Sequence, residues 1–560
     1  MTILTRSAYG EPGTSLDFKT GNWRSTEKPV HIHAKAPCHG ACPAGEDQQA
    51  WFALLQEGRV EAAWRALVAA NPLPGVTGRV CPHPCETACN RKALDGALAI
   101  HNVERWLGDE AVANGWAYPV EEPPADAPVV AIIGAGPAGV SAAYHALRHG
   151  MRARIFEAAS EAGGLLRSAI PPTRLPRAAL NAELDRVLSL PGIEVTCRAR
   201  LGRDVSVEAL AADHAAVLLA PGCQEGRDWD VGGSVPADHH EGLALLKEFM
   251  DHGQFPAAQR VIVHGGGNTA MDLCRLMKRF GVGEVTLVTA SGLPGPDTAT
   301  DDLINVVPRE LEEALEEGIE IIPHATVNRL IMRGSKVVGA EVASLKKVPG
   351  TDGRKKRVTF EGTERVRDVD MVIPCIGEMV DPEGLHSWIN RGYLRPSDHW
   401  GTLSDRIYAL GDARGDRGTV AEAIGDGARA VAAVAARLNG GEATTDTRAE
   451  LPASDLNPVY YPPAARSVAP KLPVSERTFE AEIEGDIGHE AALAEAARCL
   501  SCGNCLACDN CWTFCPDSAV IKTAELATDG SFYLFDLDYC KGCGLCAQEC
   551  PTGYIQMRPE

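Results

Sequence analysis

The sequence predicts a multidomain chain: an α-helical N-terminal domain, two Rossmann-like α/β domains and a small α+β domain at the C-terminus. Three observations predict this organisation. The chain has 560 residues, which is too long for a single hydrophobic core. Strand and helix patterns alternate between residues 129 and 440, with two glycine-rich turns among them. The 19 cysteines are concentrated near the two ends of the chain.

The composition is that of an ordinary globular protein, with 45% hydrophobic and 23% charged residues. The formal net charge of −21 argues against nucleic acid or an anionic membrane surface as a partner. We expect no membrane-spanning helix, because no run of 18 apolar residues occurs. The first residues lack the pattern of a secretory signal, so we expect a cytoplasmic protein.

The cysteines form two dense groups, five between Cys38 and Cys89 and ten between Cys499 and Cys550. In a reducing compartment, such density indicates metal binding rather than disulfide bonds. The remaining four are interpreted as small buried hydrophobic residues. They are Cys197, Cys223, Cys274 and Cys375.

The first glycine-rich turn has the full context of a dinucleotide site. A predicted strand enters Gly134-x-Gly136-x-x-Gly139, a helix follows, and the next strand ends at Glu157. Gly134 permits the tight turn, Gly136 lets the backbone approach a pyrophosphate, and Gly139 lets helix and strand pack closely. Glu157 can accept the hydrogen bonds of a ribose diol. A bare motif would be weak evidence, but here every element of its context is present.

The second turn is Gly265-x-Gly267-x-x-Ala270, again between a strand and a helix. The following strand, residues 284–288, leads into Thr-Ala-Ser at 289–291. No acid stands there to hold a ribose 2′-hydroxyl and no arginine to hold a 2′-phosphate, so the sequence favours NAD over NADP mildly. Two such sites in one chain suit a hydride relay between a nicotinamide and a flavin.

A third stretch fits the flavin side. A predicted strand, residues 406–410, ends at Gly411-Asp412, and a helix begins near Thr419. Asp412 is placed to hydrogen-bond the ribityl or pyrophosphate group of FAD. The helix start at Thr419 offers N–H groups to the flavin pyrimidine edge.

These stretches, together with NPLPGVTGRVCPHPCETAC, GGLLRSAIPPTRLP and VHGGGNTAMD, make residues 38–440 resemble a known family. It comprises the small subunit of glutamate synthase, the amino-terminal half of dihydropyrimidine dehydrogenase and the large subunit of NADH-dependent ferredoxin:NADP oxidoreductases. The resemblance implies FAD at the first turn and the pyridine nucleotide at the second. The implied FAD residues are Gly134, Gly136, Pro137, Ala138, Gly139, Glu157, Gly164, Leu165, Arg174, Gly222, Gly411, Asp412, Thr419 and Val420. The implied nucleotide residues are Gly265, Gly267, Asn268, Thr269 and Ala270.

The resemblance also bears on the N-terminal cysteines. The family has two clusters on seven cysteines, but this chain lacks the first pair, which aligns near Val30 and His33. The resemblance therefore implies one 4Fe–4S cluster. Cys38 and Cys89 are then either left over, or one of them replaces the Glu104 ligand. The alternative is that no cluster remains and these are buried thiols. The implied ligands are Cys42, Cys81, Cys85 and Glu104.

The C-terminal cysteines follow the bacterial ferredoxin pattern, C-x2-C-x2-C-x3-C-P, twice. In that pattern the fourth cysteine of each run binds the other cluster. Zinc is disfavoured by the doubled run and the prolines. Cys499 and Cys502 are surplus to the pattern, and their role stays open. The predicted ligand sets are Cys505, Cys508, Cys511 and Cys550 for one 4Fe–4S cluster, and Cys540, Cys543, Cys546 and Cys515 for the other.

The predicted function is FAD-dependent electron transfer between NAD(H) and the iron–sulfur clusters of a partner enzyme, with no catalytic side chain. The tail resembles ferredoxin-like subunits of 2-oxoacid:ferredoxin oxidoreductases, which suggests a thiamine-dependent phenylglyoxylate- or indolepyruvate-type partner, or a ferredoxin. The alternatives are a glutamate synthase small subunit, an NADH-linked donor to sulfite reductase, and a cluster-bridging scaffold. A disulfide reductase is disfavoured because residues 129–440 contain no closely spaced cysteine pair.

The predicted boundaries follow from these motifs. A helical pattern over residues 48–70 belongs to the first domain, and a short helix over 489–497 leads into the tail. The FAD-binding domain is predicted as two segments of the chain, 126–255 and 376–440, separated by the NAD(P)-binding domain at 256–375. The other predicted regions are an iron–sulfur domain with an N-terminal arm (1–125), a linker (441–495) and a ferredoxin domain (496–560).

Overall fold

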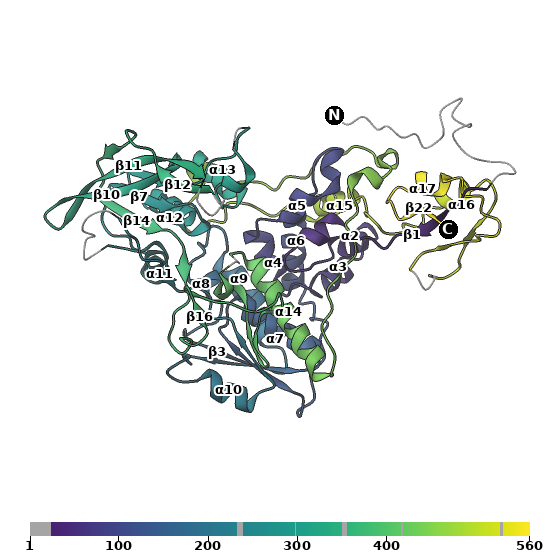
Figure 1. Cartoon of the computed structure of the whole chain (residues 1–560), viewed down its shortest axis with the longest axis horizontal. Coiled ribbons are helices and arrows are strands. Elements are labelled where there is room, and N and C mark those ends of the chain that lie inside the picture. Colours follow the sequence, from purple (N-terminus) through teal and green to yellow (C-terminus); the bar gives the residue numbers. More distant parts are fainter. Residues whose placement is uncertain (1–23, 232–238, 297, 350–354, 416–417, 527–529) are drawn as a thin grey trace.

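The computed structural model describes residues 24–560 except 232–238, 297, 350–354, 416–417 and 527–529. Its domains have the predicted fold classes (Figure 1). The helical domain lies between the two nucleotide-binding domains and the cysteine-rich tail, and the tail lies at the opposite end of the long axis from the second nucleotide-binding domain (Figure 1). Among the described residues, no helix combines the length and apolarity needed to span a bilayer.

The helical domain packs around three fully buried tryptophans, Trp51, Trp64 and Trp106. The helical pattern over 48–70 is confirmed as two helices, which Gly58, with φ 72°, separates. A Cβ on Gly78 would lie 2.5 Å from the Arg105 amide nitrogen, so α4 and α6 pack backbone to backbone. The helices are α1 (Pro37–Ala41), α2 (Gln48–Gln56), α3 (Val60–Leu67), α4 (Pro74–Val80), α5 (Pro84–Ala88) and α6 (Ile100–Ala113).

The first α/β domain is a six-stranded sheet in the order β18-β19-β5-β2-β3-β4, parallel except for β18. The apolar strand β2 is central, where both of its faces are buried. The strands are β2 (Val129–Ile133), β3 (Arg152–Glu157), β4 (Ile193–Cys197), β5 (Ala216–Leu219), β18 (Thr402–Ser404) and β19 (Ile407–Ala409). The main helices are α7 (Pro137–Arg148), α9 (Arg177–Leu188) and α14 (Val420–Leu438).

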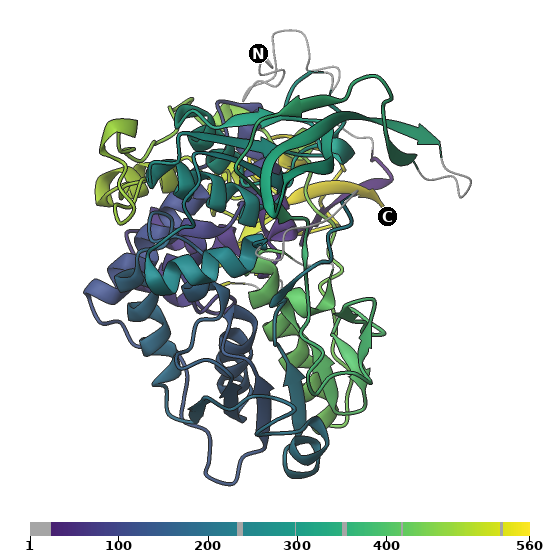
Figure 2. The same ribbon diagram turned by 90° about the vertical axis from the view of Figure 1, so that its left-hand side faces the viewer.

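The second α/β domain lies in the chain between β5 and β18 and has two sheets. A parallel sheet, β14-β7-β8-β9, carries the second glycine-rich turn after β7, and an antiparallel sheet is built on β10 and β11 (Figure 2). The strands are β7 (Arg260–Gly265), β8 (Glu284–Val288), β9 (Glu320–Ile322), β10 (Ala325–Arg333), β11 (Lys336–Pro349), β12 (Lys355–Thr359), β13 (Arg365–Arg367) and β14 (Met371–Cys375). The helices are α11 (Gly242–His252), α12 (Asn268–Arg279) and α13 (Pro308–Glu316).

The tail begins with the predicted helix α15 (His489–Ala497). The N-terminal segment, expected as an arm, contributes β1 (Glu27–His31), which pairs antiparallel with the last strand of the tail. The segment before α15 packs as a strap: Arg91 donates to the Pro462 carbonyl at 2.9 Å, and Arg477 pairs with Glu317 at 3.1 Å. The other tail elements are α16 (Asn510–Thr513), β20 (Val520–Lys522), β21 (Tyr533–Phe535), α17 (Leu545–Gln548) and β22 (Ile555–Pro559).

Candidate functional site

A cavity of about 1000 Å³ lies where the two α/β domains meet the helical domain. All predicted FAD and nucleotide residues line it except Gly139 and Ala270. Those two lie in the first turns of α7 and α12 and serve packing: a Cβ on Gly139 would lie 1.9 Å from the Gly134 carbonyl oxygen, and Ala270 is fully buried. The structure therefore brings both glycine-rich turns to one space.

The first turn fits a bound pyrophosphate. Gly134 adopts φ 97°, and a Cβ there would lie 2.3 Å from the Ala220 carbonyl oxygen. At Gly136 a Cβ would meet only the Gly164 Cα, at 3.9 Å, so the turn is open towards the cavity. Pro137 begins α7, whose N-terminal N–H groups face this opening. The residues present suit the phosphates of FAD.

Glu157 ends β3 and organises the same turn. Its Oε2 accepts a hydrogen bond from the Ala135 amide at 2.7 Å, and its Oε1 accepts one from the Ala159 amide at 2.8 Å. Each carboxylate oxygen keeps a lone pair for a further donor. The carboxylate therefore braces the loop and can still receive a ribose diol from the cavity.

Gly411, Asp412, Thr419 and Val420 line the flavin side of the cavity. Thr419 caps α14, and Glu422 completes a capping box with it, which confirms the predicted helix start. Burial, followed by the nearby Glu378 and Glu422 carboxylates, raises the pKa of Asp412 to about 6. The Cys223 thiol donates to the Asp412 carbonyl at 3.2 Å. Cys223 and Glu378 also line the cavity, and sequence reasoning did not find Glu378.

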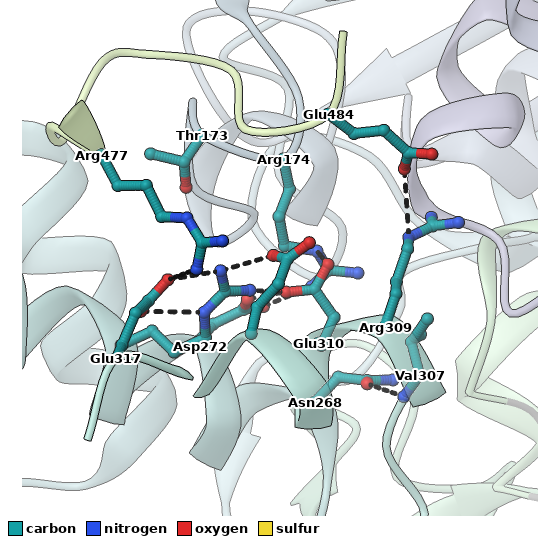
Figure 3. A network of polar contacts seen from close by, with 12 residues as sticks. Thr173, Arg174, Asn268, Asp272, Val307, Arg309, Glu310, Glu317, Arg477 and Glu484 are labelled. Atoms are coloured by element: carbon teal, nitrogen blue, oxygen red, sulfur yellow. Dashed lines mark hydrogen bonds and ion pairs between the residues drawn. The ribbon is translucent and has the colours of Figure 1, made fainter. Parts of the chain in front are cut away.

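The second turn repeats the geometry of the first. A Cβ on Gly265 would lie 2.2 Å from the Cys375 carbonyl oxygen, whereas a Cβ on Gly267 would meet nothing within 4 Å. Asn268 Oδ1 accepts the Val307 amide at 3.1 Å, as Figure 3 shows, and Thr269 donates to Glu378 Oε1 at 3.0 Å. These contacts hold α12 with its N-terminus at the cavity.

Tertiary structure adds charges beside the loop at 289–291. The His324 amide donates to the Ser291 carbonyl at 3.1 Å, and the Gly292 amide donates to the Asp302 carbonyl at 2.6 Å. The Asp302 carboxylate pairs with Lys347 at 3.1 Å and with Arg357 at 2.6 Å. Two cations that follow this loop by more than 50 residues thus lie near it, although neither belongs to the motif.

A buried ion network joins the two α/β domains (Figure 3). Arg174, from the first domain, pairs with Asp272 at 2.7 Å and with Glu310 at 2.9 Å. Arg275 pairs with Glu310, and Arg477 of the strap reaches Glu317. Arg174 lines the cavity, but its guanidinium is already held by two carboxylates.

The predicted N-terminal ligand set gathers beside this cavity. Val80 and Pro82 line it, and Cys81 lies between them in the chain. Cys81 and Cys85 are buried in one hydrophobic core, with Cys42 packed against it, and Glu104 contacts His83, two residues after Cys81, at 2.9 Å. The His83 amide points at the Cys81 sulfur at 3.3 Å, a contact that suits a charged thiolate.

A second carboxyl group, Glu46, lies at the same place and was not found from the sequence. The Asn71 amide donates to Glu46 Oε1 at 2.8 Å and to Glu104 Oε1 at 3.1 Å, so it bridges the two carboxyl groups. Burial raises the pKa of Glu104 to about 8. Glu104 also contacts His83 Nε2 at 2.9 Å.

In the tail, Cys515 of the first cysteine run lies beside three cysteines of the second run. A small cavity is lined by Cys515, Cys540, Cys543 and Cys546. Burial and then the charges of Cys508, Cys550 and Cys505 raise the pKa of Cys511 to about 12. Among the described residues, no three His, Cys, Asp or Glu side chains are placed to hold a single metal ion.

Three family models match the chain in the order of its domains. The pyridine nucleotide-disulphide oxidoreductase model matches residues 128–427, more than half of the chain. The dihydropyrimidine dehydrogenase domain II, 4Fe-4S cluster model matches residues 31–116, and the 4Fe-4S dicluster domain model matches residues 504–554.

Several proteins are similar to much of this chain. The NADP(+)-dependent formate dehydrogenase subunit beta of Moorella thermoacetica is 32% identical over 83% of this chain and 70% of its own length. The NADPH-Fe(3+) oxidoreductase subunit beta of Geobacter sulfurreducens is 30% identical over 85% of this chain and 77% of its own length. The glutamate synthase [NADPH] small chain of Azospirillum brasilense is 29% identical over 70% of this chain and 84% of its own length.

The matched models, the shared cavity and the two cysteine-rich ends agree with one another. FAD and NAD(P) fit the glycine-rich turns, and 4Fe–4S domains stand at both ends. The chain belongs to the pyridine nucleotide-disulphide oxidoreductase family, within which it is an NAD(P)H-linked flavin–iron–sulfur electron-transfer subunit.

Proposed function

We propose that this chain accepts hydride from NAD(P)H at FAD and passes single electrons through its iron–sulfur clusters to the catalytic subunit of a larger oxidoreductase. One observation carries the proposal: a single cavity is lined by both glycine-rich turns and by Val80 and Pro82, the neighbours of Cys81. A donor nucleotide, a flavin and the first cluster would therefore meet without any domain movement.

The chain's own residues bind and orient the reactants, and none needs to act as a nucleophile or acid. FAD, when bound, links a two-electron donor to one-electron acceptors. We assign Gly136 and the α7 N-terminus to its pyrophosphate, Glu157 to its ribose and the α14 N-terminus to its pyrimidine edge. Gly267 and Thr269 at the start of α12 would position the nicotinamide nucleotide.

Three clusters follow from the predicted ligand sets. We assign Cys42, Cys81, Cys85 and Glu104 to the cluster beside the cavity, because the three cysteines lie at one hydrophobic core and a backbone N–H faces the Cys81 sulfur. The tail sets are supported by the same kind of contact: the Ala519 amide points at Cys515 at 3.2 Å. The two tail sets are Cys505, Cys508, Cys511 and Cys550, and Cys540, Cys543, Cys546 and Cys515.

The choice between NADH and NADPH has support on both sides. The 289–291 loop offers no arginine, which favours NADH. Lys347 and Arg357 beside that loop favour a 2′-phosphate, and the names of three relatives contain NADP or NADPH. The ratio of kcat/KM for the two nucleotides decides between them.

The partner is proposed as a catalytic oxidoreductase subunit. Resemblance of the tail supports a 2-oxoacid oxidoreductase, and the relatives' names support a formate dehydrogenase or an iron(III) reductase. A glutamate synthase small chain is the alternative, supported by likeness over 70% of this chain. Identification of the protein that co-purifies with the chain distinguishes these partners.

Anaerobic addition of NADH or NADPH to the full chain tests the relay. We expect flavin absorbance to bleach and cluster EPR signals to appear. In Gly267→Val the nucleotide should no longer reduce the flavin, whereas dithionite should, because the new side chain projects into open space at an extended residue. Gly441→Ala, far from the cavity, is the matched control. A flavin that no nucleotide reduces in the unmodified protein would favour the scaffold alternative instead.

A further inference from the structure

Four cysteines of the two dense groups have no place in the three clusters assigned above: Cys38 and Cys89 in the helical domain, and Cys499 and Cys502 just after α15. The structure brings these two pairs together. Cys38 lies in α1, Cys89 directly follows α5, and α1 packs against α5. Cys499 packs on the same hydrophobic core as Cys38 and Cys89, although it is 410 residues from Cys89 in the chain.

Three hydrogen bonds hold the Cys499–Cys502 turn against the helical domain. Gln49 Nε2 donates to the Cys502 carbonyl at 2.6 Å, and Gln56 Nε2 donates to the Cys499 carbonyl at 3.4 Å. The Asn90 amide donates to the Cys502 sulfur at 3.6 Å. Because Asn90 follows Cys89, this last contact places the Cys502 sulfur beside the second cysteine of the other pair.

The turn has the backbone of a thiolate-binding loop. Ser501 adopts φ 46° and Gly503 φ 79°, and a Cβ on Gly503 would lie 2.7 Å from the Ala34 carbonyl oxygen. Burial raises the pKa of Cys499 to about 12, and the Ser501 backbone opposes that shift. Backbone N–H groups near sulfur in a tight turn are the surroundings that iron-bound thiolates use.

The four cysteines lie at one place in the fold. Cys89 belongs to a hydrophobic core against which Cys38 and Cys499 pack, and the Asn90 amide joins the Cys502 sulfur to the residue after Cys89. Four thiolates sharing one mostly buried space repel one another unless a cationic centre lies between them. Four cysteines at one place match the ligand set of a 4Fe–4S cluster, which would stabilise their thiolate forms.

We propose that Cys38, Cys89, Cys499 and Cys502 hold a fourth 4Fe–4S cluster, with one cysteine pair from the helical domain and one from the tail. The proposal extends the electron path proposed above. It also accounts for the pair missing near Val30 and His33: a C-x2-C pair from the distant tail supplies the two thiolates that the N-terminal segment lacks.

The position of this cluster connects the two ends of the path. Cys38 lies in α1 and Cys42 directly follows it, while Cys85 lies in α5 and Cys89 directly follows it, so the new cluster adjoins the one beside the cavity. On its other side Cys502 precedes Cys505 by three residues, which span at most about 11 Å. Electrons leaving the flavin side would thus cross to the tail through a cluster bound by both domains.

Iron and acid-labile sulfide per full-length chain, after anaerobic purification or reconstitution, test this. We expect about 16 iron atoms in the unmodified protein and about 12 in Cys499→Ser/Cys502→Ser. Cys38→Ser/Cys89→Ser should also retain about 12, and the variant combining both pairs should lose no more. Cys197→Ser, a cysteine outside every cluster, is the control and should keep all of its iron.

The iron count of the variant that combines both pairs decides the ligand set. If both pairs bind one cluster, removing them together removes only that cluster; if they bind two clusters, it removes both. A combined variant that loses about eight iron atoms, or a tail-pair variant that loses none, would overturn the proposal. Zinc in place of iron at this site would overturn it as well. Flavin content and nucleotide-driven bleaching, measured on the same variants, should be unchanged, which separates this inference from the proposed function.

Discussion

A single buried carboxyl group, Glu183, caps α4, the helix that Cys81 directly follows. Glu183 on α9 accepts hydrogen bonds from the Gly75 and Val76 amides, both at 2.8 Å, and so caps the N-terminus of α4. Burial raises the pKa of Glu183 to about 7, although these two amides oppose the shift. A carboxyl whose folded-state pKa is raised stabilises the fold at low pH, and this contribution is lost as pH rises through the folded pKa.

Glu183→Gln should remove that pH dependence. The two proteins should have similar melting temperatures at pH 5, and the variant should gain relative stability towards pH 8, by up to about 3 kcal/mol. Anaerobic thermal melts at a fixed scan rate measure the difference. Glu208→Gln, an exposed acid on the helix Val207–Asp213, should show a difference that does not change with pH. A pH-independent difference for Glu183→Gln would mean that its proton is not linked to folding.

At the scale of elements, the close contacts between α14 and its neighbours join the flavin site to the helical domain. A Cβ on Gly425 would lie 1.9 Å from the Pro43 carbonyl oxygen, and Pro43 follows Cys42. Arg429 donates to the same carbonyl at 3.2 Å. One helix therefore touches the cavity at its N-terminus and the loop after Cys42 one turn later.

Gly425→Ala should push these two domains apart. The alanine raises intrinsic helix stability by about 1 kcal/mol, but overlap with the Pro43 carbonyl should cost about 1–3 kcal/mol. We expect slower oxidation of the reduced flavin by the clusters in stopped-flow, with the rate of flavin reduction by nucleotide unchanged. Gly441→Ala should change neither rate. Equal cluster reduction in both variants would show that this contact does not set the electron path.

The pairing of β1 with β22 is the second contact at this scale, and it ties the tail to the start of the helical domain. Lys28 donates to the Cys540 carbonyl at 2.9 Å, and Pro29 lines the cavity of the second tail cysteine set. Val30 lies opposite Gln556. Hydrogen bonds at Ile32–Tyr554 and Thr26–Glu560 fix which pairs of this antiparallel ladder are hydrogen-bonded, and by that alternation the Val30 amide donates to the Gln556 carbonyl.

Val30→Pro should remove this strand hydrogen bond and expose the tail cluster. We expect faster hydrogen exchange over residues 533–558 and faster bleaching of the tail cluster in air. Val30→Thr keeps the amide and the branched shape, so it is the matched control. If the two variants exchange at the same rate, the β1 pairing does not protect the tail.

At the scale of the whole molecule, the ion network of Figure 3 fixes the orientation of the two α/β domains. Arg174 of the first domain is held between Asp272 of α12 and Glu310 of α13. Removing one member of a buried ion network leaves the others uncompensated, which typically costs about 3–5 kcal/mol. The geometry for hydride transfer should therefore depend on this arginine.

Arg174→Met should lower the rate of flavin reduction by nucleotide at least tenfold while FAD content stays the same. Arg174→Lys keeps the charge but loses the contact with both carboxylate oxygens. Its rate of flavin reduction should lie between those of the unmodified protein and Arg174→Met. Stopped-flow absorbance gives the rate, and flavin released by denaturation gives the content. Loss of FAD in Arg174→Met would instead assign this residue to flavin binding. Arg329→Met, at an exposed pair with Glu341, is the control.

The sequence by itself determined the features whose chemistry lies in consecutive residues. Both glycine-rich turns, Glu157 at the end of its strand, the start of α14 and the doubled cysteine run were predicted because local spacing specifies each of them. The fold classes followed from the same local patterns. The helical pattern over 48–70 was confirmed as well, and the structure adds that Gly58 divides it into two helices.

Only the tertiary structure decided which distant residues meet. Packing between elements far apart in the chain brings several such residues together. Glu46 lies beside Glu104, Lys347 and Arg357 lie near the loop at 289–291, and Cys502 lies beside Cys89. No local pattern encodes such contacts, because burial of shared apolar surface and long-range hydrogen bonds select them when the domains assemble.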